Sequence, residues 1–316
     1  MSSARETALN RTPTDASPTG PGSDRPPAPL EGSIPVGVKL LALSARLIGP
    51  LAPGLAGRLA YRLWFRTVRP PDPPSALPVL QAAERWRTNV EGIPVATYAW
   101  GEGSRVLLVH GWGSHTGHMT GFVAPLVERG FRVVAFDAPG HGRSPGKETE
   151  IFEFRETLRA VADRTGGPPT GAVAHSLGSL ALLDAQSSGL GVEACVLVSP
   201  GIRLDALVGA FRGRTGLTAR AAAELQRRVA AFVGPDFYDG LWETSPDRAL
   251  VLHDEEDGEI PLREARHVAR KLDGAPLLTT AGLGHRKILR APDVHEETAR
   301  FLALAPCAHL RPEGST

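Results

Sequence analysis

The chain has 316 residues, of which 35 are basic and 34 acidic, so its formal net charge is +1. This length is ample for a buried core without disulfide or metal support. The near-neutral charge argues against a protein that coats nucleic acid or another polyanion. The cysteines, Cys195 and Cys307, form neither a metal-type spacing nor a disulfide framework, so we expect a reduced, cytoplasmic setting.

Two segments of contrasting composition precede the main body. Residues 1–33 carry six prolines and few large apolar side chains, so we expect them to be disordered, and they show no targeting pattern. Residues 34–71 contain six basic residues and no acidic one. The run Pro70–Pro74 then predicts a stiff linker. We therefore expect 34–75 to be a basic helical extension with its linker.

The basic segment predicts an amphipathic helix. Its arginine stripe comprises Arg58, Arg62, Arg66 and Arg69, and its apolar face comprises Leu59, Ala60, Leu63 and Trp64. One interpretation is a helix packed on the main body with its arginines in solvent, which is common in soluble domains. The other is a peripheral contact between 34–71 and an anionic membrane or a partner.

Beyond the linker, apolar runs alternate with amphipathic segments. The predicted strands are, in chain order, 93–100, 105–110, 132–137, 171–175, 194–199, 249–253 and 276–280. The predicted helices are 119–129, 148–164, 177–187, 261–272 and 292–304. Such alternation predicts an α/β fold, a mostly parallel, doubly wound sheet with helices on both faces. The weak alternation of 93–100 predicts an edge strand.

One helix-rich stretch interrupts this alternation. Residues 201–248 are rich in helix formers and contain no convincing strand. An insertion near the carboxyl ends of parallel strands covers the ligand crevice. We therefore expect 201–248 to be a cap that shapes the substrate pocket within a domain of 76–310, although a packing layer without that role has the same composition.

The sharpest local signal is the segment Ala174-His175-Ser176-Leu177-Gly178, between a predicted buried strand and a predicted helix. A serine on so tight a turn adopts strained backbone geometry, and small residues on both sides let the turn close. The turn holds the hydroxyl at the top of the sheet, beside the amides of the helix start. In this context the segment resembles the nucleophile elbow of the α/β-hydrolase family, with Ala174 in place of the usual glycine.

The resemblance implies roles for residues in several loops. In this family the serine, the acid and the histidine follow successive strands in that order along the chain. This implies Ser176 as nucleophile, Asp257 as the orienting acid and His285 as the base. It also implies an oxyanion hole formed by the backbone N–H groups of Trp112 and Leu177. The fold implied is the α/β-hydrolase fold, with a helical cap inserted late in the sheet.

Other acids compete for the role of Asp257. Five carboxylates fall within 254–259, but their spacing does not match a calcium loop. The resemblance selects Asp257 because an apolar residue and a proline follow it at Ile260-Pro261. Glu256 is the alternative acid. The acids expected to be solvated loop charges are Asp254, Glu255 and Glu256.

Other residues near these motifs are expected to be structural. The histidines expected to be packed or solvated are His175, His253, His295 and His309. Asp137 and His141 lie in a loop, 137–144, that the family uses as a tight turn, so they receive no catalytic part. The ring of Trp112 fits either the acyl pocket or the core.

Together the motifs imply a serine hydrolase that cleaves a small-molecule carboxylic ester through an acyl-enzyme, with no cofactor, no metal and no nucleic acid partner. Haloalkane dehalogenases and epoxide hydrolases use aspartate at the elbow, so Ser176 excludes those branches. Three other reactions fit the same residues: a thioesterase, an acyltransferase or a carbon–carbon bond hydrolase. A non-catalytic ligand-binding or scaffold protein is the alternative from another class.

The net charge of +1 is an average over unlike parts of the chain. Residues 1–33 carry three basic and four acidic residues, a net −1, and 34–71 carry a net +6. The remaining residues, 72–316, therefore carry a net −4. A mildly acidic body with one strongly basic segment is compatible with contact to an anionic membrane.

Overall fold

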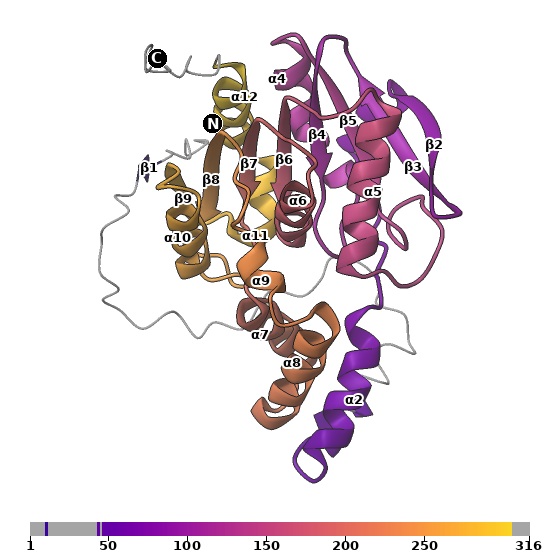
Figure 1. Ribbon diagram of the computed structural model, residues 1–316, viewed down its shortest axis with the longest axis vertical. Coiled ribbons are helices and arrows are strands. Elements are labelled where there is room, and N and C mark those ends of the chain that lie inside the picture. Colours follow the sequence, from indigo (N-terminus) through magenta and orange to yellow (C-terminus); the bar gives the residue numbers. More distant parts are fainter. Residues whose placement is uncertain (1–9, 12–42, 45, 305–316) are drawn as a thin grey trace, which may run out of the picture.

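The computed structural model describes residues 10–11, 43–44 and 46–304. A sheet flanked by helices forms the larger body, and a smaller helical lobe lies beside it (Figure 1). Of the segment expected to be disordered, 1–33, only Asn10–Arg11 are described, and they form the two-residue strand β1. The rest of that segment lies outside the described residues.

Nine strands of the described chain form one sheet in the order β1-β9-β8-β7-β6-β4-β5-β3-β2. Their bounds are β1 (Asn10–Arg11), β2 (Glu84–Val90), β3 (Ile93–Trp100), β4 (Ser104–Val109), β5 (Phe131–Asp137), β6 (Gly171–His175), β7 (Ala194–Val198), β8 (Arg248–Asp254) and β9 (Leu277–Thr280). The six strands β4 to β9 pair in parallel, whereas β1, β2 and β3 pair antiparallel. The predicted mostly parallel sheet is confirmed.

The prediction that 93–100 is an edge strand is wrong. β2 pairs with β3 along its whole length and takes the edge itself. In β2 the exposed side chains include Arg85 and Arg87, while Thr88 and Val90 are buried. A strand with one charged face has a weak apolar pattern, which is why the sequence did not predict it.

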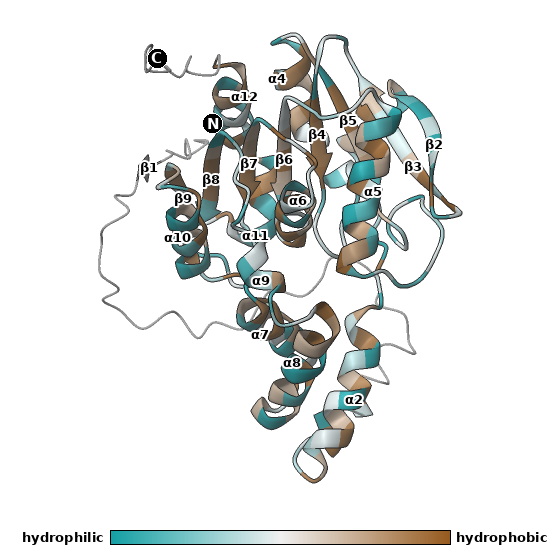
Figure 2. Cartoon of the chain, in the orientation of Figure 1, coloured by the Kyte–Doolittle hydropathy of each residue, from teal (hydrophilic) through white to brown (hydrophobic). Residues whose placement is uncertain are grey.

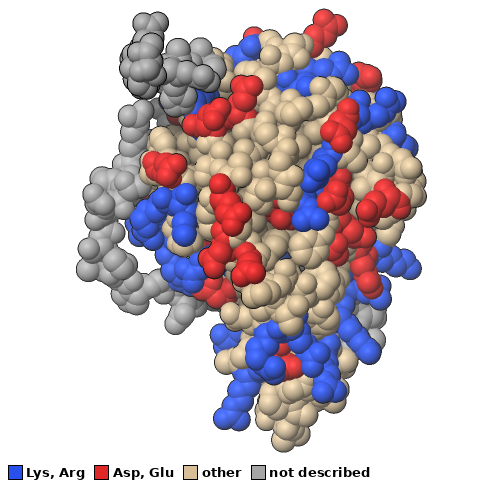
Figure 3. Space-filling view, in the orientation of Figure 1, with Lys and Arg blue, Asp and Glu red and all other residues tan. Residues whose placement is uncertain are grey.

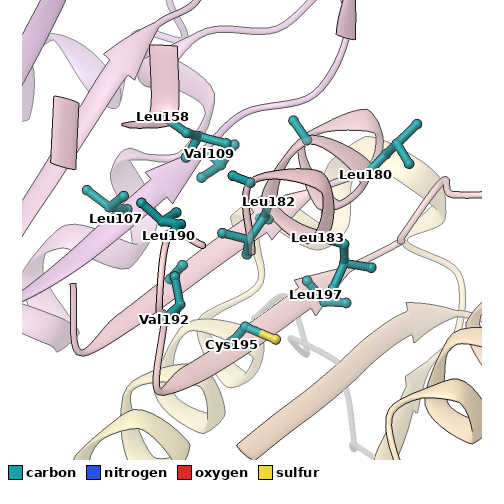
Figure 4. Close-up of a cluster of buried hydrophobic side chains, with 14 of the residues drawn as sticks. Leu107, Val109, Leu158, Leu180, Leu182, Leu183, Leu190, Val192, Cys195 and Leu197 are labelled. Carbon is teal, nitrogen blue, oxygen red and sulfur yellow. The ribbon is translucent and has the colours of Figure 1, made fainter. Parts of the chain in front are cut away.

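Helices cover both faces of the sheet. One face carries α5 (Ile151–Arg164), α6 (Leu177–Ser187) and α10 (Leu262–Lys271); the other carries α3 (Ala76–Gln81), α4 (Val123–Val127) and α12 (Pro292–Ala303). The strands between them are apolar, and the helices turn hydrophilic sides outward (Figure 2). Figure 4 shows the first layer, where Leu183 of α6 lies beside Leu197 of β7. The doubly wound arrangement is therefore confirmed.

The segment 119–129 is not one helix as predicted. It divides into a 3-10 turn, η2 (Thr120–Phe122), and the short α4, after a first 3-10 turn, η1 (Thr116–His118). Gly117 and Gly121 lie within these two turns. Each glycine loses more backbone entropy in a helix than other residues do, which shortens the regular helix.

The smaller lobe contains the segment between β7 and β8. Its helices are α7 (Leu204–Thr215), α8 (Ala219–Val233) and α9 (Phe237–Gly240). Helix α2 (Pro53–Trp64) packs along α8, and its buried residues Ala56, Gly57 and Ala60 lie on the packed side (Figure 1). The helix predicted as an extension thus packs against the predicted cap.

The predicted arginine stripe is only partly helical. Helix α2 ends at Trp64, so Arg66 and Arg69 lie beyond it. Arg66 pairs with Glu148, and Arg69 donates to the carbonyl oxygens of Gly140, Ser144 and Gly146. These arginines fix the chain to the main body. No helix within the described residues is long and apolar enough to cross a bilayer.

We predict that Gly57→Ala lowers the free energy of unfolding by about 1–3 kcal/mol, because overpacking strains the joint between α2 and α8. A Cβ at Gly57 would overlap Glu224 and lie 3.0 Å from the Ala221 carbonyl oxygen. The matched control is Gly54→Ala in the same helix, where nothing lies within 4 Å of a Cβ. Urea denaturation measures both variants; equal stability of the two would contradict the packing described here.

Candidate functional site

The turn between β6 and α6 holds Ser176 in an unusual backbone conformation. Its φ is 53° and its ψ is −123°, a region that costs a non-glycine residue on the order of 1–3 kcal/mol. Its N–H donates to the Val198 carbonyl oxygen at 3.0 Å. A Cβ at Gly178 would lie 2.5 Å from the His110 carbonyl oxygen, so only glycine fits there. The small residue expected at position 178 is therefore required for steric reasons.

The structure brings together the three side chains that the sequence selected from separate loops. His285 Nε2 lies 3.0 Å from Ser176 Oγ, and His285 Nδ1 lies 2.7 Å from Asp257 Oδ2. His285 is in the short helix α11 (Gly284–Lys287), directly after β9, and Asp257 follows β8. Their side chains are only 5% and 0% exposed. We call these three residues the Ser–His–Asp group.

Asp257 is built to stay ionised although it is buried. Its second carboxylate oxygen, Oδ1, accepts from the N–H groups of Glu259 and Ile260, each at 2.8 Å. Burial alone raises the pKa of Asp257, but the charge and hydrogen bond of His285 and the Ile260 N–H outweigh it. The pKa therefore lies well below its usual range. An ionised Asp257 fixes the ring orientation of His285 and favours its Nδ1–H tautomer.

Two backbone segments lie beside Ser176: the start of α6, and the loop after β4, where a Cβ on Gly111 would lie 2.9 Å from Ser176 Cβ. Leu177 is the first residue of α6, so its N–H has no acceptor within the helix. On the other side, the loop after β4 contains Trp112 between Gly111 and Gly113. The Gly113 N–H is already bonded to His141 Nε2, at 3.1 Å. The structure thus places Leu177 and Trp112 in the two segments next to Ser176, and their role as an oxyanion hole stays a prediction.

Two buried, uncharged histidines hold these loops together through hydrogen bonds to the backbone. His110 places Nδ1 2.8 Å from the Gly111 carbonyl oxygen and accepts from the Ala138 N–H at Nε2. His141 accepts from Gly113 in the same way and places Nδ1 near Pro139. Burial lowers the pKa of His110 to about 4 and that of His141 well below its usual value. The loops after β4 and β5 are thereby fixed without adding charge near Ser176.

Glu259 is a buried acid beside His285 to which the sequence assigned no role. Its carboxylate pairs with Arg214 of α7, lies 3.1 Å from Arg286 Nε, and lies 3.9 Å from His285 Nε2. Burial alone raises the pKa of Glu259, but His285, Arg214 and Arg286 outweigh it and lower the pKa to about 2. Glu259 thus links the lobe to the Ser–His–Asp group. The sequence offered one indication of a role for Glu259: it directly precedes Ile260-Pro261, the pair that was used to select Asp257.

The expectation that Asp254 is a solvated charge is wrong. Asp254 is fully buried and accepts from the Thr280 hydroxyl and the Leu283 N–H, at 2.7 and 3.0 Å. It thereby anchors the loop that carries His285. Glu255 and Glu256 are exposed. Among the described residues, no group of three or more His, Cys, Asp or Glu side chains is arranged to hold a metal ion.

The competing histidines are packed against backbone. His175 Nε2 lies 2.9 Å from the His285 carbonyl oxygen, and His253 Nε2 lies 3.0 Å from that of Ile260. His295 Nε2 bonds in the same way to Leu289. His309 lies outside the described residues. In the neighbouring loop, Asp137 is buried and accepts from the N–H groups of Thr116 and Arg143 and from the Tyr98 hydroxyl.

An apolar pocket of about 780 Å³, including the open space at its mouth, adjoins Ser176. Its charged lining residues are Glu150 and Arg214, and Ser176 and Tyr238 contribute hydroxyl groups. The lobe contributes Leu207, Ala210, Phe211, Arg214, Val229, Phe232, Val233, Phe237 and Tyr238. Trp64 and Phe65, at the end of α2, and the ring of Trp112 also line it. The segment 201–248 therefore shapes the pocket, and α2 shares that role, which the sequence did not predict.

Comparison with known proteins agrees with this geometry. Residues 106–312 match the alpha/beta hydrolase family, which is well over half of the chain. The chain belongs to this family. The relationship covers every strand from β5 to β9 and all three segments that carry the Ser–His–Asp group.

Two curated relatives match this alpha/beta hydrolase over very different lengths. A non-heme haloperoxidase of Rhodococcus erythropolis is 25% identical over 252 residues, which cover 63% of this chain and 91% of the haloperoxidase. A pimeloyl-(acyl-carrier protein) methyl ester esterase of Methylococcus capsulatus is 40% identical over 85 residues, 27% of this chain. That match spans 32% of the esterase.

Two solved structures share the fold. Est1E of Butyrivibrio proteoclasticus, with bound ferulic acid, has a TM-score of 0.56 and 19% identity, over 69% of this chain and 99% of Est1E. An esterase from Exiguobacterium antarcticum has a TM-score of 0.54 and 17% identity, over 69% of this chain and 98% of the esterase. At such identities the likeness establishes the α/β-hydrolase fold alone.

We predict that Glu259→Gln destabilises the protein by up to about 3 kcal/mol at pH 7, the equivalent of the fall in the Glu259 pKa from 4.5 to about 2. Because the pKa is lowered in the folded state, this stability is present above pH 4.5 and is lost as the pH falls toward 2. Urea denaturation between pH 7 and pH 3 measures it.

The matched control is Glu256→Gln, which changes an exposed acid of the same loop. It should shift the unfolding free energy by less than about 0.5 kcal/mol at every pH. A pH-independent loss in the Glu259 variant would contradict the electrostatic account of this residue.

Proposed function

We propose that the protein is a serine hydrolase that cleaves a carboxylic ester through an acyl-enzyme intermediate. One observation carries the proposal: Ser176, His285 and Asp257 form a continuous line of hydrogen bonds beside an apolar pocket. That arrangement supplies a nucleophile, a base within reach of its proton, and an ionised group that orients the base.

In the first step, Ser176 Oγ attacks the acyl carbonyl carbon while His285 Nε2 takes the hydroxyl proton. Asp257 stabilises the imidazolium that forms. The carbonyl oxygen becomes negative and accepts from the N–H groups of Trp112 and Leu177. When the intermediate collapses, the carbon–oxygen bond to the alcohol breaks, and His285 returns the proton to the departing alkoxide. The acyl group then remains on Ser176 as an ester.

In the second step, water attacks the acyl carbon, and His285 takes one of its protons. The tetrahedral intermediate collapses, the bond to Ser176 Oγ breaks, and His285 protonates that oxygen. The products are a carboxylic acid and the restored hydroxyl. The same two N–H groups stabilise the oxyanion in both steps.

The names of relatives support an ester as the substrate. One matched relative is named a methyl ester esterase, one structure with the same fold is named an esterase, and another, Est1E, holds ferulic acid. The pocket supports an apolar acyl group, because Ser176 lies among aromatic and aliphatic side chains. A thioesterase, an acyltransferase and a carbon–carbon bond hydrolase use the same nucleophile. Comparing turnover of matched oxygen esters and thioesters distinguishes a thioesterase from a carboxylic ester hydrolase.

Two expectations about the setting of the protein also stay proposals. The first is a reducing, cytoplasmic compartment: Cys195 is a buried free thiol, and Cys307 lies outside the described residues. The second is peripheral contact of 34–71 with an anionic membrane. The apolar side chains first assigned to that contact are mostly used elsewhere, since Ala60 and Leu63 are buried. Any such contact must therefore use other residues of the segment.

We predict that Ser176→Ala and His285→Gln lower kcat for a chromogenic short-chain ester by at least about 10⁴-fold. Asp257→Asn should lower kcat by about 10³–10⁴-fold, because it removes the charge that orients His285. Ser179→Ala is the control: this serine is one helical turn away and bonds to the Ala174 carbonyl oxygen. The proposal fails if the Ser176 variant keeps wild-type activity, or if folded wild type has none on any ester.

We predict that kcat/KM rises about fourfold for each methylene added to a straight-chain acyl group, until the pocket is filled. The increase follows from burial of each methylene against apolar side chains, worth about 0.8 kcal/mol. A series of nitrophenyl esters of increasing acyl length measures it. A flat or falling series would contradict acyl binding in the apolar pocket.

A further inference from the structure

The chain before α2 carries an exposed row of leucines. Leu43, Leu47, Leu51 and Leu55 recur at every fourth residue, and their exposed fractions are 49%, 67%, 91% and 49%. The chain makes a turn over residues 49–51 and then enters α2. We call these four residues the leucine tip. Four exposed leucines within 13 residues are unusual on a free protein surface.

The leucine tip differs from the apolar face predicted for this segment. The residues that α2 turns toward the lobe, Ala56, Ala60 and Leu63, are 5% exposed or less. They pack with α8 in a common apolar cluster. One set of residues in this segment therefore packs against the lobe, and a different set, the leucine tip, faces solvent.

Positive charge surrounds the leucine tip. Residues 43–66 and 204–233 together carry nine arginines and two acidic residues, and two of the arginines, Arg66 and Arg214, pair with Glu148 and Glu259 outside these segments, which leaves a net +5. Arg46, Arg58, Arg62 and Arg220 are exposed, and within the described part of the chain none of them pairs with a carboxylate. Figure 3 shows the lower end of this lobe as an uncharged end flanked by blue side chains, with most red side chains on the main body.

We propose that the leucine tip docks on an anionic lipid membrane. Leucines inserted at the depth of the headgroups remove apolar surface from water, and arginines around them meet lipid phosphates. Charge complementarity selects this occupant. A protein partner or a second copy of this chain would have to bring an acidic surface to an end that carries a net +5. The contact is peripheral and reversible, made by an end of the lobe rather than by a helix lying flat.

Docking would also orient the pocket. Helix α2 leads from the leucine tip to Trp64 and Phe65, which line the pocket. Its 12 residues span about 18 Å, so the pocket lies within a lipid length of the docked surface. This step rests on the proposed function: a docked hydrolase of this shape acts best on esters that partition into membranes.

Vesicle flotation of the full-length protein tests the proposal. The vesicles contain phosphatidylcholine alone, or equal parts of phosphatidylcholine and phosphatidylglycerol. We expect wild type to bind the anionic vesicles at least about tenfold more tightly, and Leu47→Ser/Leu51→Ser to lose at least about tenfold of that affinity. Arg58→Gln/Arg62→Gln should lose most of the preference for anionic lipid.

Each matched control also carries two substitutions, but at residues outside the leucine tip. Leu77→Ser/Leu304→Ser alters two leucines of the main body that are 46% and 52% exposed. Arg263→Gln/Arg270→Gln removes two exposed arginines of α10. Both controls should bind like wild type, and thermal melting should show that every variant is folded. Loss of binding in the controls equal to that in the tip variants would overturn the proposal.

Three other outcomes would also overturn it. Folded wild type does not float with anionic vesicles; a dimer that dissociates in Leu47→Ser/Leu51→Ser covers the tip instead; or binding begins only after deletion of 1–33, which places that segment on the tip. Hydrolysis of a soluble short-chain ester is measured in parallel and should not change in the tip variants. If that hydrolysis is absent from wild type while flotation succeeds, the proposed function fails and membrane docking stands.

Discussion

The site depends on one backbone constraint, the left-handed conformation of Ser176 at the end of β6. Strain of this kind persists only where neighbours over-determine it. Here the Ser176 N–H bonds to Val198 of the adjacent strand, and the Ser176 carbonyl oxygen accepts from Ser179 and Gly201. The close approach of Gly178 to His110 then brings the start of α6 against the loop after β4. The turn therefore holds the Ser176 hydroxyl within 3.0 Å of His285 Nε2 and against the loop after β4.

The ionised groups around that turn are concentrated at His285. Asp257 and Glu259 are both buried acids with lowered pKa, and both lie within 4 Å of a nitrogen of His285. Asp257 orients the ring from the Nδ1 side, whereas Glu259 lies on the Nε2 side and is paired with arginines. His110 and His141 stay neutral because burial lowers their pKa. The site thus concentrates ionised groups at one histidine and keeps the surrounding loops uncharged.

Sequence reasoning was strongest where local chemistry is restrictive. The strand–serine–helix turn and the loop containing His285 have few alternative structures, and in the structure Ser176 and His285 lie within hydrogen-bond distance of each other. It was weakest where tertiary contacts decide: β2 has one charged face and becomes a strand by pairing with β3. Helix α2 ends at Trp64 although the arginine spacing continues, because Arg69 bonds to the loop at Gly140 instead. Glu259 gains its importance from residues distant in sequence: Arg214, 45 residues earlier, and His285 and Arg286 in the loop after β9.

The most direct test of the account is to locate the nucleophile chemically. Folded protein is treated with a fluorophosphonate, which reacts with serines activated by a neighbouring base. The adduct is then mapped by peptide mass spectrometry. The account predicts a single adduct on Ser176, at the turn between β6 and α6, and no adduct in Ser176→Ala. An adduct on another serine, or folded wild-type protein that forms none, would contradict it.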